Sequence, residues 1–322
     1  MVVVRVPASS ANLGPGFDCL GMALSLYNYV SMEEKTDGPR LQIKLGGTFQ
    51  TGIAADDTNL VYQSAMRLWA KVDFKPHGIF LNLINNVPPS RGLGSSSAAI
   101  VGGLVAANIL AGAPLTQEQL LELACEIEGH PDNVAAALYG GVTLAMQQAG
   151  SACICRQLGS LDGLTAVVAV PATSLSTRLA RSLLPSQVPL SDAVWNLGHT
   201  ALMVTAILTK DYSLLQSAMQ DCLHEQYRSQ AIPGMDKALV AAREAGALGA
   251  VLSGAGPSLL ALTAEKQDSK AVGQAMLDAL ANAGIDAKIV YLHPDSDGAV
   301  QISSLPSELQ SQLGGNCGVL AC

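Results

Sequence analysis

The stretch Pro88-Pro89-Ser90-Arg91-Gly92-Leu93-Gly94-Ser95-Ser96-Ser97-Ala98-Ala99 governs how the rest of the chain is interpreted. Residues 79–84 before it alternate apolar and polar side chains and predict a strand, whereas residues 98–110 are almost wholly apolar and predict a buried helix. The two glycines let the backbone adopt positive φ and approach a ligand closely. The first amides of the following helix lack partners inside it and carry the positive end of its dipole, which suits a phosphate chain.

The same pattern also fits a plain turn before a helix. A Walker loop requires Lys and then Ser or Thr after its last glycine, where this chain has Ser95 and Ser96. A dinucleotide fingerprint requires a third glycine, where Ser97 stands. The loop is therefore either a phosphate cradle of another type or a simple turn.

Length, composition and charge narrow the class of protein. The chain has 322 residues, of which 49% are hydrophobic and 14% charged, so we expect a compact protein of two domains or one large one. The net charge of -8, without a long basic run, disfavours nucleic acid as a partner.

The sequence also predicts the compartment. No uninterrupted apolar run reaches membrane-spanning length, and residues 1–6 predict a strand instead of a signal peptide. Seven cysteines without a Cys-x-x-Cys pair predict scattered buried thiols in a reducing compartment, and five dispersed histidines argue against a zinc site. We therefore expect a cytoplasmic protein with no membrane partner.

A second segment rich in small residues follows the first predicted strand. It reads Pro7-Ala-Ser-Ser-Ala-Asn-Leu-Gly-Pro-Gly-Phe-Asp18, and as a plain turn it would be unusually long and unusually poor in charge. As a binding loop it offers the amide of Asn12 and the carboxylate of Asp18 to an amino or hydroxyl group of a small substrate. We favour the binding loop.

The helix predicted at residues 116–128 carries a row of acidic residues. Glu118, Glu122 and Glu126 lie four apart and share a face, with no Lys or Arg four residues on to balance them. Such a row is usually a solvated face, but a divalent cation that bridges phosphates would balance it equally well. The polar turn Gly129-His-Pro-Asp-Asn133 follows directly, so this region predicts a site.

The second half contains further candidates. Residues 176–184 predict a helix that places Thr177 and Arg181 on one face. A second glycine motif, residues 249–258, lies between two apolar strands and is either a hairpin turn or part of the site of the first glycine loop. Residues 301–322 predict a loose extension, so we expect domains at 1–160 and 161–300 and a C-terminal extension at 301–322.

Together these motifs resemble the GHMP kinase superfamily, named for its galactokinase, homoserine, mevalonate and phosphomevalonate members. The resemblance rests on residues 7–18, Pro88-x-x-x-Gly-Leu-Gly-Ser-Ser-Ser-Ala98, Glu128-Gly-His-Pro-Asp-Asn133, Ser176-Thr-x-x-Ala-Arg181, His224-x-x-x-Arg228 and Ser253-Gly-Ala-Gly-Pro-Ser258. The glycine loop is typical of the whole superfamily, whereas residues 7–18, the Gly-His-Pro-Asp-Asn element and the Arg181 and Arg228 segments together indicate its homoserine-phosphorylating branch.

This resemblance implies an α+β, two-layer fold with an N-terminal lobe like ribosomal protein S5 and a ferredoxin-like C-terminal lobe. It implies ATP and Mg²⁺ as cofactors, L-homoserine as the substrate and O-phospho-L-homoserine as the product, in threonine biosynthesis. The oligomeric state is left open, with a homodimer among the options.

The resemblance also implies roles for individual residues. Those expected at ATP are Asn59, Pro89, Ser90, Arg91, Gly92, Leu93, Gly94, Ser95, Ser96, Ser97, Gly254 and Gly256. Those expected at homoserine are Asn12, Asp18, His130, Arg181 and Arg228, the arginines because a planar guanidinium grips a carboxylate bidentately. Ser96 and Glu122 are expected to hold magnesium, Glu122 because it lies eleven residues before Asn133 as the family's acidic ligand does.

The expected catalytic residues are Asn133, Thr177 and Arg181. Many superfamily members have an aspartate base where this chain has Asn133, and an amide cannot accept the hydroxyl proton. The homoserine branch similarly lacks that base. We therefore expect the substrate hydroxyl to give its proton to the transferred phosphoryl group, because positioning and charge stabilisation supply most of the acceleration in such reactions. Asp132 is the rival base.

Two other functions remain open at this stage: a superfamily kinase for an isoprenoid-pathway substrate, and a nucleotide-binding relative without catalysis. Arg181 and Arg228 favour an amino-acid substrate, which needs a grip on its carboxylate. The intact glycine loop, Ser96 and Glu122 favour catalysis.

Overall fold

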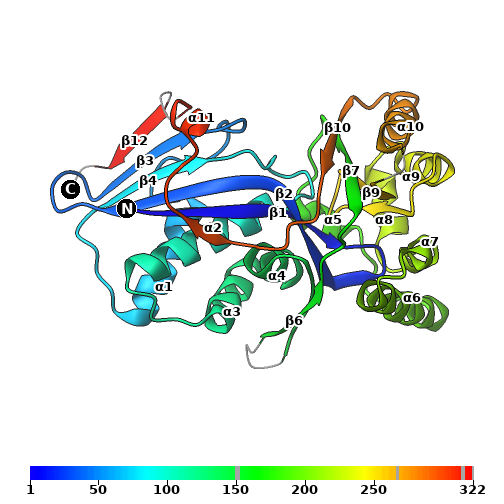
Figure 1. Cartoon of the computed structure of the whole chain (residues 1–322), viewed down its shortest axis with the longest axis horizontal. Helices are drawn as coiled ribbons and strands as arrows, with labels where there is room; N and C mark the ends of the chain where they lie inside the picture. Colours follow the sequence, from blue (N-terminus) through cyan, green and yellow to red (C-terminus); the bar gives the residue numbers. More distant parts are fainter. Residues whose placement is uncertain (149–152, 266–267, 313–315, 321–322) are drawn as a thin grey trace.

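The computed structural model describes residues 1–148, 153–265, 268–312 and 316–320, which form two β-sheets side by side, each with helices packed on it (Figure 1). Within these residues the first sheet has eight strands: β1 (Val2–Asn12), β2 (Gly16–Glu34), β3 (Leu41–Gly46), β4 (Ile79–Ile84), β5 (Val142–Gln147), β6 (Cys153–Gly159), β11 (Val300–Ile302) and β12 (Asn316–Leu320). The order along the sheet is β11-β1-β2-β4-β3-β12, and β5 and β6 extend it from β2.

The hairpin of β1 and β2 connects the two halves of the molecule. These long antiparallel strands run from the first lobe into the second (Figure 1). The residues between Ala8 and Leu13 were expected in a loop, but β1 continues to Asn12 and leaves only a short turn before Gly16. The reason is burial: Ser9 and Ser10 are fully buried where the strand passes between the lobes, so small side chains are needed there for packing.

Four helices cover one face of the first sheet: α1 (Leu60–Val72), α2 (Ser95–Leu110), α3 (Gln117–Glu128) and α4 (Asp132–Tyr139). The central one, α2, is apolar on nearly all sides because it lies between the sheet and the other helices. Its glycines allow this: a Cβ on Gly102 would lie 2.8 Å from Val30 Cγ2, and one on Gly103 would lie 2.4 Å from Val61 O. The helix that directly follows the glycine loop is therefore fixed tightly in the core.

The second sheet contains β7 (Leu164–Pro171), β8 (Gly249–Leu252), β9 (Leu259–Ala264) and β10 (Ala287–Leu292), in the antiparallel order β10-β7-β9-β8. The helices α9 (Met235–Glu244) and α10 (Ser269–Ala281) pack on one face. The other face packs against α6 (Leu190–Thr209), α7 (Leu215–Ala218) and the ends of β1 and β2. The succession of β7, α9, β8, β9, α10 and β10 is the split β-α-β arrangement expected for a ferredoxin-like lobe.

The remaining elements are short: α5 (Thr177–Ser182), α8 (Glu225–Arg228), α11 (Ser307–Gln310) and the 3-10 turns Tyr212–Leu214 and Ser229–Ala231. Residues 212–218 form a 3-10 turn followed directly by the short α7. None of the helices in the described ranges has the length and apolar composition that crossing a bilayer requires.

The C-terminal segment was expected to be a loose extension, and this prediction is wrong for the part that the structure describes. The strand β11 pairs with β1, and β12 pairs with β3, so both add to the first sheet. Pairing of this kind covers backbone groups at the edges of a sheet, which explains why a polar segment without strong hydrophobic periodicity is ordered. Residues 313–315 and 321–322 lie outside the described residues.

The packing of α2 gives a prediction for two helical glycines. Gly103→Ala should lower the free energy of unfolding by about 1–3 kcal/mol, because its Cβ must displace the Val61 carbonyl of α1. Gly198→Ala in α6 is the matched control: no atom lies within 4 Å of the added Cβ, so it should raise stability by about 0.5–1 kcal/mol. Urea unfolding measures both, and a Gly103→Ala variant as stable as the parent would contradict the tight packing.

Candidate active site

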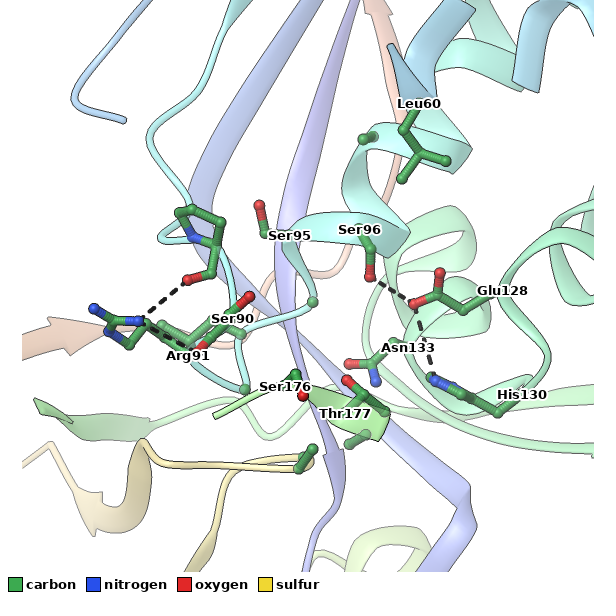
Figure 2. Close-up of a pocket in the computed structure, with 18 of the residues that line it drawn as sticks. Leu60, Ser90, Arg91, Ser95, Ser96, Glu128, His130, Asn133, Ser176 and Thr177 are labelled. Atoms are coloured by element: carbon green, nitrogen blue, oxygen red, sulfur yellow. Dashed lines mark hydrogen bonds and ion pairs between the residues drawn. The ribbon is translucent and has the colours of Figure 1, made fainter. Parts of the chain in front are cut away.

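A cavity of about 480 Å³ lies between the two lobes, at the start of α2. Its lining comes from the turn before α1, the glycine loop, the turn between α3 and α4, the start of α5, and the second glycine motif. Figure 2 shows Ser96, Glu128, His130 and Asn133 directed toward one another, with Thr177 nearby at the start of α5. Residues that are distant in the sequence therefore meet in one place.

The glycine loop has the backbone conformation expected for a ligand cradle. Gly92 and Gly94 have φ of 74° and 66°. A Cβ would lie 2.1 Å from Ser253 O at Gly92 and 2.0 Å from Ser9 Oγ at Gly94, so no larger residue fits at either position. The N-cap of α2 is Gly94, and no side chain caps the helix. The first amides of α2 are therefore available to a ligand in the cavity.

The rest of the chain holds this loop from three sides. The amide of Ser9 in β1 donates to Leu93 O at 3.1 Å. The Arg91 side chain donates to Pro171 O at 3.0 Å and to Ala172 O at 2.7 Å, at the end of β7. Ser253 Oγ donates to Gly92 O at 2.7 Å, so the second glycine motif supports the first. The loop's shape is set before any ligand binds.

Glu128 is the carboxylate that the structure brings to the start of α2. Its Oε1 accepts hydrogen bonds from Ser96 Oγ at 2.7 Å and from Ser97 Oγ at 2.8 Å. Glu122, the expected metal ligand, does not line the cavity, and its charge acts on Cys153 of β6. The two glutamates are six residues apart on α3, which puts them about 9 Å apart along the axis and on different faces. Glu122 thus lies outside the cavity, whereas Glu128 lines it.

These oxygens fit a hard divalent cation. Ser96 and Glu128 offer a hydroxyl and a carboxylate within hydrogen-bond distance of each other, beside the amides suited to phosphates. Within the described ranges, no cluster of three or more His, Cys, Asp or Glu side chains could hold a metal by itself. This donor set matches magnesium, which commonly takes one or two carboxylates and completes its shell with phosphate oxygens and water.

The turn between α3 and α4 presents a second polar group. Asp132 is buried, and its Oδ1 accepts from the Asn133 amide at 2.7 Å and lies 2.7 Å from His130 Nδ1. Burial lowers the pKa of His130, but the hydrogen bond and charge of Asp132, with the charge of Glu128, outweigh it and leave that pKa raised. Asn133 Oδ1 accepts from Ser9 Oγ at 2.9 Å. Both side chains of the Asp-Asn pair are thus engaged by protein partners.

On the other side of the cavity, Asp18 and Arg181 form a bidentate ion pair. Arg181 Nη1 and Nη2 lie 2.9 and 2.7 Å from the two oxygens of Asp18, and both side chains are about one-third exposed. Asn12 holds Asp18 in place, because its Oδ1 accepts from the Asp18 amide at 3.1 Å while its Nδ2 donates to Gly254 O at 2.9 Å. Asn12 and Asp18 both adopt positive φ, 70° and 57°, at the end of the hairpin.

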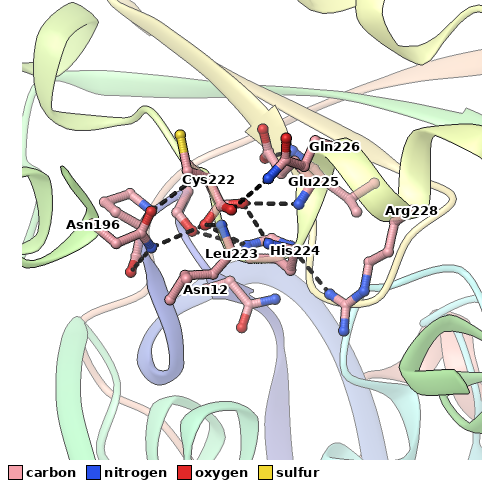
Figure 3. A network of polar contacts seen from close by, with 12 residues as sticks. Asn12, Asn196, Cys222, Leu223, His224, Glu225, Gln226 and Arg228 are labelled. Atoms are coloured by element: carbon pink, nitrogen blue, oxygen red, sulfur yellow. Dashed lines mark hydrogen bonds and ion pairs between the residues drawn. The ribbon is translucent and has the colours of Figure 1, made fainter. Parts of the chain in front are cut away.

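Arg228 also lines the cavity but is buried and held by fixed partners (Figure 3). Its Nη1 donates to Gly254 O at 3.1 Å and lies 3.3 Å from His224 Nδ1. His224 Nε2 lies 2.9 Å from Gly14 O. Since a carbonyl only accepts and a guanidinium only donates, His224 carries its proton on Nε2 and its lone pair on Nδ1 faces Arg228. The imidazole must be neutral for this arrangement.

The electrostatics agree with a neutral His224. Burial lowers its pKa, and the charge of Arg228 acts in the same direction, against the opposing charge of Asp221. Asp221 also accepts from the amides of His224 and Glu225 at 2.7 and 2.8 Å, which fixes the start of α8. Glu225 accepts from the Leu252 amide at 2.6 Å and ties α8 to β8, and burial raises its pKa to about 8.

Most of the residues expected at the site line this one cavity: Asn12, Asp18, Asn59, Pro89, Ser90, Arg91, Gly92, Leu93, Gly94, Ser95, Ser96, His130, Asn133, Thr177, Arg181, Arg228 and Gly254. Three do not. Ser97 is buried and binds Glu128, Gly256 packs against Ile232 and Leu252, and Glu122 lies elsewhere on α3. Asn59 is the N-cap of α1, with Oδ1 accepting from the Val61 amide at 3.0 Å, so it has a structural as well as a lining position.

The structure adds lining residues that the sequence did not single out. Glu128 could have been found from its place at the last turn of a helix directly before a polar turn. Ser176, the N-cap of α5, adjoins Thr177. Asn85 and residues 52–54 line the cavity only because of tertiary packing, and no local sequence pattern predicts this position.

Comparison with known proteins agrees with this geometry. The family model for the GHMP kinases N terminal domain matches residues 59–141, and the model for the GHMP kinases C terminal domain matches residues 203–282. A homoserine kinase from Desulfitobacterium hafniense is 50% identical over 94% of this chain and 100% of its own length. One from Carboxydothermus hydrogenoformans is 43% identical over 96% of this chain and 99% of its own.

A solved structure gives the same result. The crystal structure of homoserine kinase from Cytophaga hutchinsonii superposes with a TM-score of 0.84 at 33% identity, and the match covers 94% of this chain and 97% of that one. The chain therefore belongs to the GHMP kinase superfamily, and within it to the homoserine kinase family.

Proposed function

We propose that this enzyme transfers the γ-phosphoryl group of ATP to the side-chain hydroxyl of L-homoserine and forms O-phospho-L-homoserine, a step of threonine biosynthesis. The observation that carries the proposal is the pairing of two recognition elements across one cavity. The uncapped start of α2 suits an anionic chain, and Asp18 with Arg181 and Arg228 suits an amino acid.

The nucleotide's phosphates are proposed to lie on the amides of Ser95 to Ser97, at the positive end of the α2 dipole. Ser96 and Glu128 are proposed to hold Mg²⁺, which would neutralise phosphate charge when bound. The cavity extends from the glycine loop to Asn59 and Leu60 at the start of α1. The adenosine part of ATP is proposed to lie at this end of the cavity. Binding is favoured because the loop is already in its final shape.

Homoserine recognition is proposed from the charged side chains on the side of the cavity opposite the glycine loop. Arg181 and Arg228 both lie over the Phe17 ring, at 5.7 and 5.3 Å from its centroid, and Asp18 balances only one positive charge. Burial lowers the pKa of Arg228, and the charge of Arg181 lowers it further. A substrate carboxylate would relieve this repulsion, while the substrate ammonium would take up one oxygen of Asp18.

The chemical step then needs only positioning and charge stabilisation. An oxygen–phosphorus bond forms to the homoserine hydroxyl as the bond from the γ-phosphorus to the bridging oxygen breaks, and ADP leaves. We propose that the hydroxyl proton passes to the transferred phosphoryl group, because Asn133 is an amide and Asp132 is occupied by His130 and the Asn133 amide. Thr177 and Arg181 are proposed to position the reacting hydroxyl and stabilise the charge.

The two glutamates of α3 provide a matched test of the metal assignment. Glu128→Gln should lower kcat by about 100-fold or more, because a preorganised charge beside the reacting phosphates is lost. Glu122→Gln should stay within about twofold of the parent, since Glu122 does not line the cavity. A coupled ADP-release assay at varied Mg²⁺ measures both, and a larger loss for Glu122→Gln would refute the proposed role of Glu128.

The neutral His224 predicts a selective defect in substrate binding. His224→Leu removes the acceptor for Arg228 and should raise KM for homoserine by about tenfold, which corresponds to about 1.4 kcal/mol, with KM for ATP unchanged. His224→Asn keeps an acceptor oxygen and should recover part of the loss, whereas His199→Leu on α6, outside the cavity, is the control.

The pH dependence of the parent enzyme completes this test. Because the pKa of His224 lies below its usual value, the imidazole stays neutral in the folded protein below about pH 6.5, where an ordinary histidine gains a proton. The unfolded chain takes up that proton, so His224 should lower the free energy of unfolding as the pH falls, which urea unfolding at several pH values measures. An equal rise in both KM values in His224→Leu would indicate general damage instead.

The absence of a side-chain base is tested at Asp132. Asp132→Asn should keep kcat within about tenfold of the parent, the loss arising from the altered His130 contact. A loss of several orders of magnitude in turnover, with an unchanged circular dichroism spectrum and melting temperature, would make Asp132 the base.

A further inference from the structure

A pair of thiols lies outside the cavity, between α3 and β6. Cys125 of α3 is buried, Cys153 of β6 is half-buried, and their Sγ atoms are 3.5 Å apart. Cys155 is two residues further along β6 and points to the same side of the strand, as residues two apart in a strand do. Neither Cys125 nor Cys153 lines the cavity, so the proposed reaction gives them no role.

The two thiols of the close pair are not equivalent. The hydrogen bond from Cys125 lowers the pKa of Cys153, although burial and the charge of Glu122 oppose this. The same hydrogen bond, together with burial, raises the pKa of Cys125. By contrast, burial raises the pKa of Cys155 to about 12. Cys153 is thus the more accessible thiol of the pair and the one that loses its proton more readily.

We propose that Cys125 and Cys153 form a redox modification site, in which a hydroperoxide converts the two thiols to a disulfide that joins α3 to β6. The Cys153 thiolate attacks one oxygen of the hydroperoxide, the O–O bond breaks, and a sulfenic acid forms with release of water, or of an alcohol from an alkyl hydroperoxide. The Cys125 sulfur then attacks the sulfenic sulfur and expels a second water. The sulfurs lose two electrons in total, which reduce the peroxide, and a dithiol reductant reverses the change.

The position of Cys125 connects this site to the cavity. Cys125 lies in the last turn of α3, and its carbonyl accepts from the Gly129 amide that closes the helix. Glu128, which binds Ser96 and Ser97, lies between these two residues. A disulfide requires an S–S distance of about 2.05 Å, so the two sulfurs must approach from the present 3.5 Å. Any part of this approach that moves the last turn of α3 shifts the turn that positions Glu128.

We therefore expect the disulfide to lower kinase activity, an effect that rests on the proposed function and on the role of Glu128 in it. A several-fold, reversible rise in the Mg²⁺ concentration needed for half-maximal activity is the expected signature. The disulfide itself does not depend on the function, so its formation is measured separately.

The experiment treats the full-length protein with hydrogen peroxide under native conditions and maps its peptides without reduction. The expected product is a cross-linked Cys125–Cys153 peptide pair about 2 Da lighter than the two thiol peptides together, lost after dithiothreitol. Cys153→Ser and Cys125→Ala should both abolish it, whereas Cys155→Ser, on the same side of β6, should retain it. Activity is followed in parallel at limiting and saturating Mg²⁺.

Each outcome decides a separate point. A cross-link that forms equally well through Cys155, or the absence of any Cys125 cross-link while other thiols oxidise, would overturn the modification site. Formation of the disulfide without a change in activity would overturn its link to Glu128. If the reduced parent enzyme has no kinase activity, the proposed function is contradicted. The peptide map alone then decides whether the modification site exists. Activity loss that persists in Cys153→Ser would assign the sensitivity to another residue.

Discussion

The uncapped amides at the start of α2 are the feature on which the site depends. The first amides of a helix have no partners inside it, and here Gly94, the N-cap, has no side chain to supply one. The core fixes α2 through Gly102 and Gly103, so the helix cannot tilt to find other acceptors. A ligand with several anionic oxygens satisfies these donors, and the neighbouring Ser96 and Glu128 supply the oxygens for its cation.

The second requirement is that two lobes meet around that helix end with little free space. Several of the contacts that join them use small residues: Ser253 Oγ donates to Gly92 O, and the Gly254 amide donates to the Ala11 carbonyl at 3.1 Å. A larger side chain at Gly92 would push the lobes apart, because its Cβ would lie 2.1 Å from Ser253 O. The same hairpin that contributes Ser9 carries Asn12 and Asp18, so one element aligns the nucleotide side with the substrate side.

The sequence predicted most of the elements and much of the candidate site, because these depend on local patterns. The strand before the glycine loop, the apolar helix after it, and the capping box of Thr116 and Gln119 all have local signals. The sequence did not reveal that Glu128, and not Glu122, lines the cavity, because spacing along a helix does not tell which face meets another element. The residues before Asn12 were mistaken for a loop because small residues suit both turns and crowded strands. The pairing of β11 and β12 with the first sheet is a tertiary event without local periodicity.

The central claim is that the amides at the start of α2 hold the phosphates while Arg181 and Arg228 hold the substrate's carboxylate. A crystal structure with a non-hydrolysable ATP analogue, Mg²⁺ and homoserine tests it most directly. We expect phosphate oxygens within hydrogen-bond distance of the Ser95 to Ser97 amides. We also expect the homoserine carboxylate to contact both arginines and the homoserine hydroxyl to face the terminal phosphate. Phosphates docked away from α2, or a carboxylate that touches neither arginine, would contradict it.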